Sequence, residues 1–106
     1  MPKYLVQASY TTEGVKGLLK DGGSKRRAAA EAAIKGLGGR LEAFYFAFGE
    51  TDVFAIAEMP DNASATAVSL AVTASGAVRT RITVLLTPEE VDQATKKTVS
   101  YRPPGT

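Results

Sequence analysis

The fold is decided by the stretch Glu42-Ala-Phe-Tyr-Phe-Ala-Phe48, which is followed after four residues by Val53-Phe-Ala-Ile-Ala57. Successive residues of a β-strand point to opposite faces of its sheet, so a strand that is apolar at every position has both faces shielded from water. The helices of a 106-residue chain can cover one face of such a sheet. We therefore expect a second copy of the chain to cover the other face.

Hydrophobic periodicity, helix caps and turn residues predict the remaining elements of a small α+β domain. In chain order we expect a strand at 3–9, a helix that begins after Thr11 and is interrupted at Gly22, a second helical stretch capped by Ser24, strands at 40–48 and 52–58, a helix at 62–75, a strand at 79–86 and a short helix at 87–97. This β-α-β-β-α-β order predicts a ferredoxin-like sandwich, in which a four-stranded antiparallel sheet carries both main helices on one face. The domain then spans residues 1–97, and residues 98–106 form an extended tail.

Side-chain size predicts which face of the sheet carries the helices. Both main helices are rich in alanine, which brings a helix close to the sheet and leaves large strand side chains to fill the layer. If Phe48 pairs with Val53, the core face carries Val6, Phe44, Phe46, Phe48, Val53, Ala55, Ala57, Ile82 and Val84. The open face then carries Leu5, Gln7, Ala43, Tyr45, Phe54, Ile56, Glu58, Arg79 and Arg81. A one-residue slip in the hairpin would exchange its two sets.

Several large apolar side chains of the open face would meet water in a single copy of the chain. Each such group forgoes about 1.5–3 kcal/mol if it stays exposed. We therefore expect a homo-oligomer whose interface contains Leu5, Tyr45, Phe54 and Ile56. The alternative is a monomer whose terminal helix folds back across the sheet.

Composition narrows the chemistry that the chain can perform. It has 13 Lys and Arg against 11 Asp and Glu, and it has no cysteine and no histidine. These absences exclude disulfides, thiolate nucleophiles and iron–sulfur clusters, and they remove the commonest general base and metal ligand. We expect no cofactor and no metal. A net charge of +2 is too small to indicate binding to nucleic acid, so we expect no nucleic-acid partner. No apolar run approaches the length of a membrane span or the pattern of a signal peptide. We therefore expect no membrane partner and a cytoplasmic location.

Five polar side chains of the open face form a candidate ligand site: Gln7, Tyr45, Glu58, Arg79 and Arg81. An arginine and a tyrosine in a half-apolar cleft can orient a carboxylate-bearing or aromatic ligand. The alternative is structural, because Glu58 and Arg81 can pair across the oligomer interface and fix its register.

A second candidate site is the basic turn that contains Gly23, Ser24, Lys25 and Arg26. Flexible backbone amides and cations at a helix start are typical of anion binding. A helix start followed by a solvated basic turn explains the same residues more simply. Glu50 and Asp52 flank the hairpin, and Asp61 follows the third strand. Paired carboxylates can hold a hard cation or share acid–base work, although turn and capping roles explain both aspartates more simply.

The chain resembles the GYD-domain family, a group of small bacterial proteins with a ferredoxin-like fold of the dimeric α/β-barrel type. The resemblance is carried by Tyr4, Tyr10-Thr-Thr-Glu-Gly14, Leu37-Gly-Gly39, Gly49-Glu-Thr-Asp-Val53, Glu58-Met-Pro-Asp61, Gly76-Ala-Val-Arg-Thr80 and Thr87-Pro-Glu-Glu90. Thr51 stands in place of the tyrosine for which the family is named. The resemblance implies the fold and self-association but no particular chemistry.

These observations favour a non-catalytic binding or structural module with a modest pocket for a small molecule. The alternative is a cofactor-independent enzyme that acts on an aromatic or small-acid metabolite, with Tyr45 and Arg81 stabilising an oxyanion. A nucleic-acid regulator would depend on the short cluster Lys20, Lys25, Arg26 and Arg27, and is the weakest hypothesis.

Overall fold

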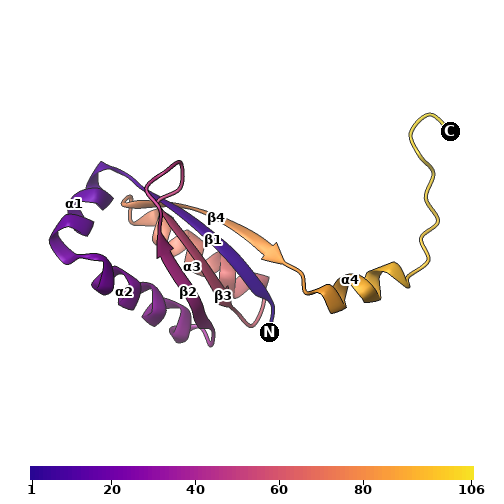
Figure 1. Cartoon of the computed structure of the whole chain (residues 1–106), viewed down its shortest axis with the longest axis horizontal. Coiled ribbons are helices and arrows are strands. Elements are labelled where there is room, and N and C mark those ends of the chain that lie inside the picture. The colour runs from indigo at the N-terminus through magenta and orange to yellow at the C-terminus, as the bar shows by residue number, and fades with distance from the viewer.

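The computed structural model describes all 106 residues and contains one four-stranded antiparallel sheet (Figure 1). Its strands are β1 (Lys3–Tyr10), β2 (Arg40–Phe46), β3 (Val53–Glu58) and β4 (Val78–Leu85), in the order β2-β3-β1-β4. The helices are α1 (Thr12–Asp21), α2 (Gly23–Gly36), α3 (Asn62–Ala74) and α4 (Pro88–Thr95). The predicted α+β arrangement, with its ferredoxin-like order of elements, is confirmed.

Side-chain caps begin three of the four helices. Thr11 accepts a hydrogen bond from the amide of Gly14, Asp61 accepts one from an amide in the first turn of α3, and Thr87 forms a capping box at α4. At α2 the prediction was wrong, because Ser24 lies inside the helix and the N-cap is Gly22. The corner between α1 and α2 needs a φ of 82° at this residue, which glycine adopts without a steric penalty.

The hairpin between β2 and β3 differs from the prediction by two residues. Phe46 pairs with Val53, whereas Phe48 lies beyond the strand with a φ of 57° and 62% of its surface exposed. Asp52 explains the early turn: its amide donates to the carbonyl of Ala8 at 2.9 Å, and its carboxylate accepts from the amide of Tyr10 at 2.8 Å. A shift of two residues keeps every other side chain on its predicted face.

The core lies between the sheet and the two long helices. Its main cluster contains Tyr4, Ile34, Leu41, Ala55, Ala57, Met59 and Ala65, and a smaller one contains Ala8, Val53 and Val78. Helix α2 packs mainly on β2, and α3 packs mainly on β4. The helices therefore cover the two outer strands, and the two central strands lie beneath the space between them.

Helix α4 and the residues after it extend away from the rest of the chain, beyond the end of β4 (Figure 1). Every residue from Pro88 to Thr106 is exposed. The radius of gyration is 17.0 Å, against about 13 Å for a compact domain of this length. In this structure α4 leaves the open face of the sheet uncovered, so the arrangement of the monomer alternative is not observed.

Candidate functional site

The predicted open face is organised in rows that cross all four strands. One row consists of Tyr45, Phe54, Gln7 and Arg81, each paired with its neighbour in register. The adjacent row consists of Ala43, Ile56, Leu5 and Thr83. The four predicted interface residues therefore form one continuous patch across β1, β2 and β3. In the single chain Tyr45 is 71% exposed and Phe54 is 37% exposed.

A charged cluster closes one end of this patch. The carboxylate of Glu58 lies 3.0 Å from Lys3 Nζ and 3.0 Å from Arg40 Nη2, and Glu42 contacts the same two cations. Hydrogen bonding with Glu42, followed by Lys3 and Arg40, lowers the pKa of Glu58 to about 2. The carboxylates of Glu42 and Glu58 raise the pKa of Lys3 in turn. Glu58 thus has partners within its own chain and lies four residues along β3 from the row of Tyr45 and Phe54.

A polar notch of about 390 Å³ lies at the other end of the open face. Three of the five predicted ligand residues line it, namely Gln7, Arg79 and Arg81, together with Glu50 and Thr51 of the hairpin loop. Two guanidinium groups beside a carboxamide form a suitable surface for a carboxylate or another small anion.

Tyr45 and Arg81 occupy opposite edges of the sheet. Tyr45 is on β2 and Arg81 is on β4, with β3 and β1 between them. Three strand spacings separate their backbones by about 14 Å. The two side chains of one copy therefore do not converge on one atom of a ligand, which weakens the idea of a shared oxyanion site within a single chain.

The four residues of the basic turn have different surroundings. A Cβ atom on Gly23 would lie 3.0 Å from the ring of Phe46, so this part of the turn packs against β2. Ser24 and Lys25 are exposed, whereas Arg26 is half-buried and lines a cavity on the helix side of the sheet. Anion binding by this turn stays a prediction.

Asp52 and Asp61 are both used by the backbone. Asp52 holds the end of the hairpin loop to β1 through the amide of Tyr10. Asp61 accepts from the amide of Ser64 at 2.8 Å, and this hydrogen bond lowers the pKa of Asp61. The turn and capping roles explain both residues.

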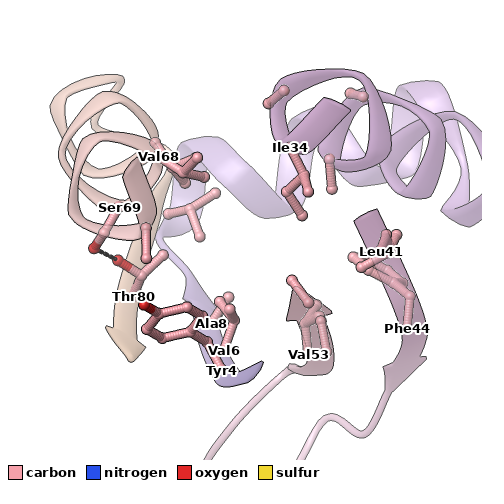
Figure 2. Close-up of a pocket in the computed structure, with 18 of the residues that line it drawn as sticks. Tyr4, Val6, Ala8, Ile34, Leu41, Phe44, Val53, Val68, Ser69 and Thr80 are labelled. Atoms are coloured by element: carbon pink, nitrogen blue, oxygen red, sulfur yellow. Dashed lines mark hydrogen bonds between the residues drawn. The ribbon is translucent and has the colours of Figure 1, made fainter. Parts of the chain in front are cut away.

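The sequence reasoning missed an apolar cavity of about 150 Å³ between α2, α3 and the sheet (Figure 2). Of its 21 lining residues, 18 are hydrophobic. We expected large strand side chains to fill this layer, and that expectation was wrong at three alanine positions of the two central strands. Ala8, Ala55 and Ala57 lie beneath the alanine-rich helices, so small side chains meet small side chains. Alanine on both sides of the layer was the signal that could have revealed the cavity.

Comparison with known families gives one match. A family described as the GYD domain matches residues 4–95, which is most of the chain and includes all four strands except Lys3, the first residue of β1. No curated protein and no solved structure is detectably similar to the chain. None of the helices has both the length and the apolar character required to cross a membrane.

Proposed function

The chain belongs to the GYD-domain family, and we propose that it is a non-catalytic binding module that works as a homo-oligomer. Two copies pack their open sheet faces together through Leu5, Tyr45, Phe54 and Ile56. The polar notch at the end of this face then holds a small organic anion. The proposal has two separable parts, which are the assembly and the ligand.

The assembly is supported above all by the surface that the single chain leaves exposed. Its accessible surface is 7383 Å², whereas a compact monomer of 11.1 kDa has about 5,700 Å². The excess of about 1,700 Å² is twice the roughly 800 Å² that each partner contributes to a standard interface. Every residue of α4 and the tail is exposed and contributes to this excess. On the open face, Tyr45 is 71% exposed and Phe54 is 37% exposed.

The order of side chains on the open face suits a two-fold interface. Such an interface uses the same patch on both copies, so an apolar centre meets an apolar centre. The row of Ala43, Ile56, Leu5 and Thr83 supplies this centre. The charged cluster lies on one side of the row and the polar notch on the other, which resembles the polar rim of known interfaces.

The ligand is supported by the composition of the notch. Arg79 and Arg81 place two cations beside the carboxamide of Gln7, and guanidinium groups bind carboxylates through paired hydrogen bonds. A second copy packed over the open face would remove water from the notch and strengthen these contacts. Tyr45 lies in the row of Gln7 and Arg81 and provides an aromatic surface at its far end.

The assembly is tested by sedimentation equilibrium of the full chain and of Phe54→Asp. We expect the wild-type chain to have a mass above 11.1 kDa that falls on dilution. Phe54→Asp places a charge in the centre of the patch and should give a folded monomer by circular dichroism. A wild-type mass of 11.1 kDa at every concentration would refute the assembly.

The ligand is tested by thermal shift with succinate and malonate, small carboxylates without an aromatic body, because a ligand of the native state raises the melting temperature. We expect Arg81→Ala and Arg79→Ala, each of which removes one cation of the notch, to abolish the shift and Arg102→Ala, an exposed arginine of the tail, to retain it. A shift that survives both site variants would exclude the notch. Chemical turnover of a bound acid would favour the enzyme alternative.

A further inference from the structure

The apolar cavity on the helix side of the sheet lies across the sheet from the proposed interface. We infer that it binds a small amphipathic acid, with an aromatic or short alkyl body in the cavity and its carboxylate at Arg26. This site is separate from the notch of the open face, so it does not depend on the proposed function.

The size of the cavity points to a small organic molecule. Protein interiors are packed at the density of organic crystals, and voids much larger than a water molecule are few. A cavity of about 150 Å³ equals the volume of a known engineered apolar cavity that stays free of water and binds benzene. A body about the size of a phenyl ring therefore fits this space.

Alanine makes up seven of the 21 residues that line the cavity. Figure 2 shows Ile34 of α2 and Val68 of α3 on two sides of the space, above the strands that carry Val6, Ala8 and Val53. Much of the remaining lining is alanine, which has no side-chain rotation that could fill a void. The cavity persists because the two helices pack on the outer strands and leave the small residues of the central strands between them.

Tyr10 and Arg26 are the polar residues at the end of the cavity near α1. Tyr10, Arg26, Val72 and Val78 line both this cavity and the neighbouring one beside α1, so the two spaces meet at these residues. Elsewhere, the hydroxyls of Ser69 and Thr80 already hydrogen-bond each other at 2.5 Å. An entering ligand would thus find its polar partners at Tyr10 and Arg26.

Arg26 has no partner of its own within the chain. Its guanidinium makes no ion pair within 4.0 Å and no side-chain hydrogen bond, although the residue is half-buried. The hydroxyl of Tyr10 is also without a hydrogen bond. Both groups stay in contact with solvent, because no side-chain nitrogen or oxygen is buried without a hydrogen-bond partner. At the edge of an apolar cavity they complement a carboxylate joined to an apolar body.

The test uses the full chain, uniformly labelled with ¹⁵N, titrated with phenylacetate and separately with benzene. We expect both probes to shift the amide signals of Ala55, Ala57 and Val68. Arg26→Gln should weaken phenylacetate binding by about tenfold or more and leave benzene binding unchanged. Arg27→Gln, the same change at the neighbouring exposed arginine, should alter neither.

Ala33→Leu provides a second variant that fills the cavity from its wall. Ala33 is exposed and also lines the cavity, so it lies at the edge of the cavity, where a larger side chain can enter without displacing the helix. We expect Ala33→Leu to abolish binding of both probes while the rest of the spectrum keeps the native dispersion. The inference is overturned if phenylacetate shifts none of the cavity signals, or if Arg27→Gln weakens its binding as much as Arg26→Gln does. Arg81→Ala should leave phenylacetate binding intact, which separates this site from the notch.

Discussion

Filling the cavity should stabilise the protein, and Ala33→Leu is the substitution that shows it best. Leucine adds three carbon atoms to alanine, and burying each contributes about 0.8 kcal/mol. Ordering the leucine side chain costs about 0.5–1 kcal/mol. We therefore expect Ala33→Leu to raise the free energy of unfolding by about 1–2 kcal/mol.

The matched control is Ala32→Leu, which adds the same side chain at the next position of α2. Ala32 is exposed and does not line the cavity, so we expect a change of less than about 0.5 kcal/mol. Both variants are measured by urea denaturation at one protein concentration, because self-association would otherwise shift the midpoint. A loss of stability in Ala33→Leu, or equal effects of the two variants, would show that the helices close over the central strands and that the cavity does not exist in solution.

Three further predictions concern the contacts that hold the fold. A Cβ atom on Gly39 would overlap the carbonyl oxygen of Glu58. Gly39→Ala should therefore lower the free energy of unfolding, measured by urea denaturation, by about 1–3 kcal/mol. The control Gly36→Ala has open space around the new methyl group and should leave this free energy unchanged. Tyr4 is buried, and its hydroxyl donates a 2.5 Å hydrogen bond to the side chain of Asn62 at the start of α3. Tyr4→Phe should therefore lower the free energy of unfolding by about 1 kcal/mol. An unchanged urea midpoint would mean that this hydrogen bond is not formed. The pKa of Glu58 is lowered to about 2, so its contribution is complete above the unfolded value of about 4.5 and is lost as the pH falls toward 2. The urea midpoint of the wild-type chain should therefore fall more steeply with decreasing pH in this range than the midpoint of Glu58→Gln. Glu50→Gln, a change at an exposed carboxylate, is the control and should behave like the wild-type chain. Parallel pH curves for the wild-type chain and Glu58→Gln would contradict the ion-pair cluster.

Much of the fold could be predicted because its signals are local. Thr11, Asp61 and Thr87 begin helices where their side chains accept hydrogen bonds from backbone amides. The alternation of side chains placed Tyr45 and Phe54 on the same face, and the observed register pairs them directly. The open face could be identified because its apolar residues fall at alternate positions of adjacent strands.

The errors arose where a contact between distant segments decides the structure. The end of β2 depends on Asp52, whose bonds to β1 turn the chain before Phe48 can join the strand. The register of β2 also shifts between Leu41 and Ala43, which brings Leu41 into the core and lets Glu42 reach Lys3 on the open face. An irregularity of this kind leaves no trace in a simple alternating pattern.

The candidate sites were harder to predict than the fold. Gln7, Arg79 and Arg81 were grouped correctly because they face the same way on neighbouring strands. Glu58 is on the same face, but it lies at the opposite end from the notch, where Lys3 and Arg40 are its ion-pair partners. The place of Arg26 beside the cavity depends on how far α2 and α3 lie apart, which no sequence pattern reports.

The central claim is that a second copy of the chain covers the open face of the sheet, and thiol labelling tests it most directly. The protein has no cysteine, so Tyr45→Cys and Leu19→Cys each carry one thiol, at positions that are 71% and 81% exposed in the single chain. We predict that Leu19→Cys reacts rapidly at every protein concentration, whereas Tyr45→Cys reacts slowly and becomes faster on dilution. Equal, rapid labelling of both variants at every concentration would contradict the claim.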